Sequence, residues 1–254
     1  MTPRTHALEK AFALLTAVAE SRGSQSLPVL AERTQLPLST AHRLIATLEG
    51  LGLIVREKKG RYFIGPVVMD LIRNITPHDV MARVSRPFLR DLARRYRMTV
   101  HLAVYEGDMV TYLAKESVGR STVQTMEGAQ LEAYCSGLGK VLLAHLPERD
   151  RERYLAAGPF VALTANTITD PAALREELHR IIRRGYALDD GEILETLKCV
   201  AVPLKDQHGR TCAALSLSGR AEEFTPKFIR EAVAVLKKNA ADISERLFPH
   251  ANGI

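Results

Sequence analysis

Residues 30–49 read LAERTQLPLSTAHRLIATLE, which predicts the end of one short helix, a break and a complete second helix. The break falls at residues 35–37, where Pro37 cannot continue a helical hydrogen-bond pattern. The second helix is expected over residues 38–49, because its apolar side chains recur at helical spacing. Those side chains are Ala41, Leu44, Ile45 and Leu48. The outer face near the start of this helix carries Ser39, Thr40, His42 and Arg43.

The flanking segments complete a small domain. A first helix is predicted from the spacing of four residues that would form its inner face, Leu8, Phe12, Leu15 and Ala19. A second, short helix starts at Pro28, because proline is tolerated in a first helical turn. Two β-rich runs, residues 53–56 and 61–64, enclose a turn that ends in Gly60 and so predict a hairpin. Three helices followed by a hairpin describe a winged helix-turn-helix over residues 1–66, whose third helix would dock in a DNA major groove.

The distribution of charge favours a nucleic acid partner over a plain helical bundle. Residues 1–100 contain 16 Lys and Arg against 8 Asp and Glu, whereas residues 101–254 contain 19 against 21. The excess positive charge of the chain, +6 in total, is therefore concentrated in the first hundred residues, as in a module that binds a polyanion. The residues expected to contact DNA are Ser39, Thr40, His42 and Arg43 on the helix, and Lys58, Lys59 and Arg61 on the hairpin.

The rest of the chain predicts a linker helix over residues 67–82 and a second domain over residues 83–254. A long helix is expected over residues 80–97, with a kink or a restart at Pro87. Further helices are predicted at residues 137–146, 148–157 and 170–184 and after Pro226. Alternating or short apolar runs predict strands at residues 100–105, 109–114, 186–189, 199–204 and 211–218. Strands and helices in this order describe an α+β domain with an antiparallel sheet.

At this point the chain resembles the IclR family of bacterial transcriptional regulators. The resemblance starts with residues 30–49 and the Leu-Gly-Leu at 51–53, and it continues far downstream. The downstream motifs are CSGLGKVLLA at 135–144, GYALDDGE at 185–192, CVAVPL at 199–204 and AALSLSG at 213–219. The resemblance implies that the second domain is GAF-like and binds a small metabolite, and that the protein forms dimers or tetramers. It assigns effector contacts to Leu131, Gly137, Leu138, Asp189, Cys199, Ser216 and Ser218.

Those residue types suit a small organic or aromatic acid. Gly137 and Leu138 open a predicted helix, whose free N–H groups favour an anion. Ser216 and Ser218 alternate along a strand, so both hydroxyls point to one face. Asp189 would accept hydrogen bonds, and a few polar groups in an apolar cleft are typical of a ligand site. Taken singly, each of these residues also fits an ordinary packing role.

Three short stretches depart from the family pattern. Thr196 and Leu197 stand where the family usually has a Gly shortly before the cysteine, and residues 192–195 are more apolar than usual. Tyr134 and Cys135 replace smaller residues before the Ser-Gly pair, so Tyr134 either reshapes the pocket or offers its hydroxyl to the ligand.

Other function classes receive less support. The run from Gly137 to Lys140 lacks the glycine and the hydroxyl residue that a phosphate-binding loop needs, because Tyr134 and Val141 occupy those positions. No histidine is placed as a base for a cysteine nucleophile, so we expect no catalytic site and no cofactor. The scattered cysteines and histidines predict no metal site. A thiol-based redox-responsive regulator built on Cys135, Cys199 or Cys212 is the main alternative. A small-molecule enzyme with a basic DNA-binding appendage is a weaker one.

The sequence therefore predicts a DNA-binding transcriptional regulator, with repression favoured over activation. Its partners would be double-stranded operator DNA and a small effector, and one winged helix reads too few base pairs alone, so a homodimer or homotetramer is expected. No apolar stretch approaches the ~18 residues of a membrane span, and the first residues lack the pattern of a signal peptide, which favours a cytoplasmic location.

Overall fold

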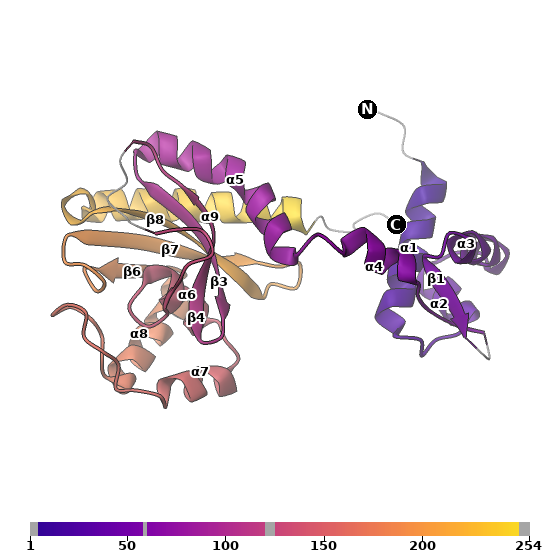
Figure 1. Cartoon of the computed structure of the whole chain (residues 1–254), viewed down its shortest axis with the longest axis horizontal. Coiled ribbons are helices and arrows are strands. Elements are labelled where there is room, and N and C mark those ends of the chain that lie inside the picture. Colours follow the sequence, from indigo (N-terminus) through magenta and orange to yellow (C-terminus); the bar gives the residue numbers. More distant parts are fainter. Residues whose placement is uncertain (1–4, 58–59, 120–124, 249–254) are drawn as a thin grey trace. The chain divides into compact units, whose positions relative to one another are not determined.

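The computed structural model describes residues 5–57, 60–119 and 125–248. They divide into two compact units, residues 5–76 and 77–248 (Figure 1). The break falls inside the segment that the sequence assigned to a linker, residues 67–82, and separates its first helix from the next one. Each unit is described on its own.

The N-terminal unit is a winged helix-turn-helix, as predicted. It contains the helices α1 (His6–Ser21), α2 (Leu27–Arg33), α3 (Leu38–Gly50) and α4 (Pro66–Ile72) and the hairpin β1 (Ile54–Glu57) and β2 (Arg61–Ile64). Leu30 of α2 and Ile45 of α3 pack in one core with Ile54 of β1. This core fixes α3 against α2 and leaves the outer face of α3 exposed.

The predicted inner face of α1 is wrong. Leu8 and Phe12 are each 59% exposed, whereas Leu14, Ala17 and Val18 are buried. The helix has apolar residues on more than one side, so periodicity alone does not decide which side meets the core. Packing against α2 and α3 selects the stripe that contains Leu14 and Val18.

The C-terminal unit is an α+β domain built on one antiparallel sheet, as predicted. Among the described residues the strand order is β5-β4-β3-β8-β7-β6. The strands are β3 (Thr99–Glu106), β4 (Met109–Glu116), β5 (Gln130–Glu132), β6 (Ala187–Asp190), β7 (Leu197–Lys205) and β8 (Thr211–Arg220). The helices are α5 (Pro77–Tyr96), α6 (Gly137–Ala144), α7 (Glu148–Leu155), α8 (Pro171–Arg184) and α9 (Pro226–Leu247), with a short 3-10 turn at Ala221–Glu223.

The helices cover both faces of this sheet (Figure 1). Helices α5 and α9 lie on one face, where Leu89 and Leu236 meet Val202 and other strand residues. Helices α6, α7 and α8 lie on the other face, where Leu138 and Leu178 share a core with Ala201. Two hydrophobic cores therefore sandwich the sheet, and the second one borders the site described below.

Side chains and a glycine define the ends of α8 and α9, close to the predicted bounds. The carboxylate of Asp170 accepts a hydrogen bond of 2.7 Å from the N–H of Ala173 and caps α8, which ends at Gly185 in the left-handed conformation. The hydroxyl of Thr225 caps α9 in the same way. The sequence predicted a kink or a restart at Pro87, and α5 is one continuous helix across that residue, so no restart occurs there. A short strand, β5, lies in a stretch where no strand was predicted.

Candidate functional site

Two rows of side chains cross the face of the sheet that α6 covers. One row runs from Asp189 on β6 through Cys199 on β7 to Ser218 on β8. The next row contains Ala201 on β7, Ser216 on β8 and His101 on β3. Directly paired residues on neighbouring strands lie about 5 Å apart and share a face. Strand pairing therefore brings together four of the predicted site residues. Asp189, Cys199 and Ser218 form the first row, and Ser216 belongs to the second.

The N-terminus of α6 lies against these rows at β7. A Cβ atom added to Gly137 would lie 3.2 Å from the Sγ atom of Cys199 and 3.5 Å from the Cβ atom of Ala201. The helix begins at Ser136, whose hydroxyl accepts a hydrogen bond of 2.9 Å from the N–H of Gly139. The first N–H groups of an α-helix have no partner within the helix, so this end favours a negatively charged group.

A cavity of about 230 Å³, called here the α6 cavity, lies between this helix end and the two rows. Its volume equals that of roughly eight water molecules, which suits one small ring or a short chain. It is lined by His101, Tyr112, Thr125, Leu131, Ser136, Gly137, Leu138, Asp189, Ile193, Leu194, Leu197, Cys199 and Ser218. Six of the seven predicted effector residues are in this set. Ser216 is not, and its buried Oγ atom has no hydrogen-bond partner among the described residues.

Sequence reasoning missed one side of the cavity, formed by His101, Tyr112 and Thr125. The Nε2 atom of His101 lies 2.7 Å from the Oγ1 atom of Thr125, and its ring lies 4.9 Å from that of Tyr112. Burial, with a smaller effect from Lys115, lowers the pKa of His101 from 6.5 to about 3, so the imidazole is neutral at physiological pH. In the sequence, only one feature could have indicated this side of the cavity: His101 is a lone polar residue on the inward face of a predicted strand. The same pattern also fits a histidine packed in the core.

A carboxylate borders the opposite side. Asp189 is buried, and burial raises its pKa from 3.8 to about 6, although the N–H of Glu192 donates to its Oδ1 atom at 2.7 Å and Lys140 acts in the opposite direction. Behind it, Lys140 of α6 forms an ion pair with Glu192. Burial raises the pKa of Glu192 from 4.5 to about 7, and Lys140 opposes this rise. Perturbed carboxyl groups beside a cavity are typical of functional sites.

The cysteines give little support to the redox alternative. Burial raises the pKa of Cys135 and of Cys199 to about 12 and that of Cys212 to about 11. All three therefore stay in the thiol form at neutral pH, and the thiolate is the form that reacts with oxidants.

Tyr134 lies outside the α6 cavity. Its hydroxyl donates to the carbonyl of Val161 at 2.8 Å, and its ring stacks on Phe160 with centroids 4.7 Å apart. It lines a separate hollow of about 360 Å³ together with Asp108 and Arg153, which form an ion pair. Tyr134 therefore packs away from the α6 cavity.

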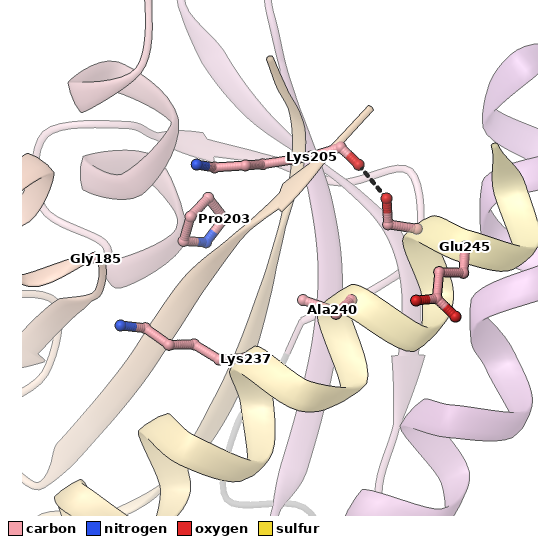
Figure 2. A pocket seen from close by; sticks show the side chains of 8 residues that line it. Gly185, Pro203, Lys205, Lys237, Ala240 and Glu245 are labelled. Carbon is pink, nitrogen blue, oxygen red and sulfur yellow. Dashed lines mark hydrogen bonds between the residues drawn. The ribbon is translucent and has the colours of Figure 1, made fainter. Parts of the chain in front are cut away.

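A larger hollow of about 430 Å³ lies between β7 and α9 (Figure 2). Figure 2 shows the ammonium groups of Lys205 and Lys237 on the same side of it, with Glu245 further along α9. Its polar groups already hold the fold together. Lys237 donates to the carbonyl of Arg184 at the end of α8, and Ser244 donates to that of Lys205. None of the predicted site residues lines this hollow, so it is a weaker candidate than the α6 cavity.

The predicted DNA-contacting residues that the structure describes lie on the surface of the N-terminal unit. Ser39, His42 and Arg43 are exposed on α3, and Thr40 is half-buried. Arg61 is exposed at the start of β2, whereas Lys58 and Lys59 lie outside the described residues.

No helix in the described ranges is long and apolar enough to cross a membrane. Those ranges also contain no group of three or more His, Cys, Asp or Glu side chains arranged to hold a metal ion.

Two family profiles match the chain. The IclR helix-turn-helix domain matches residues 7–58, and the profile described as bacterial transcriptional regulator IclR C-terminal matches residues 73–245. The transcriptional repressor IclR of Escherichia coli (strain K12) is 30% identical over 247 residues, which cover 96% of this chain and 90% of that relative. The HTH-type transcriptional regulator BhcR of Paracoccus denitrificans (strain Pd 1222) is 32% identical over 216 residues, which cover 84% of this chain and 77% of that relative.

Solved structures show the same similarity. The Thermotoga maritima IclR structure has a TM-score of 0.63 and 32% identity, covering 96% of this chain and 99% of that one. An IclR homolog from Microbacterium hydrocarbonoxydans, complexed with 4-hydroxybenzoate, has a TM-score of 0.64 and 27% identity, covering 95% and 98%.

Proposed function

The chain belongs to the IclR family of bacterial transcriptional regulators, and from this premise we propose that a small organic acid in the α6 cavity controls how tightly the protein holds its operator. The observation that carries the proposal is the convergence of Gly137, Asp189, Cys199 and Ser218 on one cavity. These residues come from α6, β6, β7 and β8, and they combine an anion-binding helix end with hydrogen-bonding side chains. The two functions lie in different units, so effector control requires an energetic coupling between them that acts in both directions.

The ligand class follows from the lining of the cavity. The carboxylate of an organic acid would meet the N–H groups of Gly137 and Leu138, and the apolar body would meet Leu131 and Ile193. The Microbacterium relative that was solved with 4-hydroxybenzoate supports an acid of this size. Relatives that carry repressor in their names include the Escherichia coli IclR protein and the Salmonella typhimurium acetate operon repressor, and they favour repression here.

Operator binding is assigned to α3 and the hairpin. Ser39, Thr40, His42 and Arg43 would lie nearest the bases, and Lys58, Lys59 and Arg61 would neutralise phosphates. A homodimer or homotetramer would place two such units on two half-sites.

We expect Arg43→Ala to weaken binding to the operator by about 10- to 100-fold, the effect of losing one good base contact. Arg43 is exposed on the outer face of α3, so the change should leave the fold intact. The measurement is fluorescence anisotropy on the intergenic DNA upstream of the gene, with unrelated competitor DNA and a series of salt concentrations. Arg61→Ala is the matched control, because it should weaken binding to all sequences and reduce the log–log salt slope by roughly one. An Arg43→Ala protein with full, competitor-resistant affinity would contradict the assignment of α3.

We expect Asp189→Asn to stabilise the protein without ligand at pH 7.5, by at most about 3 kcal/mol. The folded pKa of about 6 lies above the ordinary value of 3.8, so the folded state binds more protons between these values. Stability therefore falls as pH rises through that window, and the Asn variant escapes this loss. Denaturant unfolding of both proteins from pH 7.5 down to pH 4 would measure the difference, which should shrink as the pH falls. A variant less stable than the wild type at pH 7.5 would show that the charge of Asp189 serves the fold rather than the ligand.

A further inference from the structure

We propose that the effector is a monocarboxylic acid with a neutral hydroxyl or carbonyl group at its far end, and that His101, Thr125 and Tyr112 recognise this second group. This inference rests on the proposed function, because it assumes that the α6 cavity holds the effector. It adds a second recognition point, formed by side chains of β3 and β4 and by Thr125, to the one formed by the N-terminus of α6.

The two recognition points lie apart on the same sheet. Gly137 sits over Cys199 and Ala201 on β7. His101 lies on β3, which is separated from β7 only by β8, and Tyr112 lies one strand further, on β4. Adjacent strands are about 4.8 Å apart, so His101 lies roughly 10 Å across the sheet from the helix end. A ligand that spans this distance has polar groups at both ends and an apolar body between them.

The polar groups on the β3 side suit an oxygen-bearing group. The His101 ring and the Thr125 hydroxyl are joined by a hydrogen bond of 2.7 Å, and both line the cavity. The Tyr112 side chain is almost completely buried, and its hydroxyl has no hydrogen bond among the described residues, although it belongs to the lining. The Tyr112 hydroxyl can therefore still donate to or accept from a ligand oxygen in the cavity.

The charges around the cavity favour a neutral group at this end. The His101 imidazole carries no charge at physiological pH, and the cavity already contains the carboxyl of Asp189. Among the described residues, the cation that acts on His101 is Lys115, its direct partner across β3 and β4. Its ammonium group donates to the backbone carbonyl of Thr125 at 2.9 Å, and Lys115 does not line the cavity. No Lys or Arg side chain of the described ranges lines the cavity, so a second carboxylate would lose its hydration there without a compensating charge.

Calorimetric titration of the full-length protein tests the inference with two probe series. One series is benzoate, 4-hydroxybenzoate and terephthalate, and the other is butanoate, 4-hydroxybutanoate and succinate. In at least one series we expect the hydroxy acid to bind about tenfold more tightly than its parent acid, and the dicarboxylate to bind most weakly. Tyr112→Phe and Thr125→Val should each reduce this preference to about twofold or less, while the affinity for the parent acid changes little.

Tyr105→Phe is the matched control. Tyr105 is on β3, but its hydroxyl donates to Asp108 at 2.8 Å and it does not line the cavity, so the preference should survive. The proposal is wrong if no hydroxy acid binds more tightly than its parent acid, if a dicarboxylate binds best, or if the cavity variants keep the preference. The titration contains no DNA, so acids that bind here as expected without changing operator affinity would overturn the proposed function instead.

Discussion

Lys140→Met is expected to lower the free energy of unfolding by about 3–5 kcal/mol at pH 8, which is the usual effect of removing one partner from a buried ion pair. Lys140 is 1% exposed and its partner Glu192 is 5% exposed. The pair joins α6 to the segment after β6, which also supplies Ile193 and Leu194 to the α6 cavity. Without Lys140, the carboxyl group of Glu192 stays buried with no compensating charge, so the folded state must either bury a carboxylate or take up a proton.

The effect should depend on pH in a defined direction. The folded pKa of Glu192 is already about 7, against an ordinary value of 4.5, and losing Lys140 raises it further. The folded state then keeps a proton that the unfolded state releases, so stability falls as pH rises from 4.5 through the folded pKa. Denaturant unfolding should therefore show a much smaller loss at pH 5 than at pH 8.

The double variant Lys140→Met with Glu192→Leu is the control, because it removes both charges and replaces them with apolar groups. It should recover most of the stability lost in the single variant. A single-variant loss that is the same at pH 5 and pH 8 would show that the destabilisation comes from packing and not from the unpaired carboxylate.

Gly139→Ala is expected to destabilise the protein by about 3 kcal/mol or more and to lower its melting temperature by about 6–12 °C. A Cβ atom at Gly139 would lie 2.1 Å from the carbonyl oxygen of Ala133 and 2.5 Å from its Cα atom. These are backbone atoms, so they cannot swing away as a flexible side chain would. In an open helical site the same change is stabilising by up to about 1 kcal/mol, so the expected effect has the opposite sign to helix propensity.

Two other glycines serve as controls for thermal unfolding. Gly50 at the end of α3 has nothing within 4 Å of an added Cβ atom, so Gly50→Ala should leave the melting temperature unchanged or raise it. A Cβ atom at Gly137 would come no closer to another atom than 3.2 Å, the distance to the Sγ atom of Cys199. We therefore expect Gly137→Ala to fold and to lose ligand affinity instead. Equal melting temperatures for the Gly139 and Gly50 variants would contradict the close approach of α6 to Ala133.

Much of the fold was predictable from local spacing. Helix α3 and the β1–β2 hairpin follow from apolar residues at helical and alternating spacing, and the ends of α8 follow from Asp170 and Gly185. The inner face of α1 could not be predicted in this way, because Phe12 and Leu14 are equally suitable for a core. Only packing against α2 and α3 buries Leu14. Strand β5 was missed because it has three residues, too few to show a period, and exists through its pairing with β4.

The sequence by itself determined that two modules of different charge follow one another, that the first is a winged helix-turn-helix, and that its relatives are transcriptional regulators. It also marked Gly137, Asp189 and Ser218 as site residues, through motifs shared with the family. The tertiary structure decided that these three lie around one cavity with His101 and Tyr112, and that Tyr134 lies elsewhere. The physical reason is that alternation along a strand is a local property, whereas the neighbour across a sheet depends on strand order and register. His101 meets Ser216 only because β3 pairs with β8, across more than a hundred residues of chain.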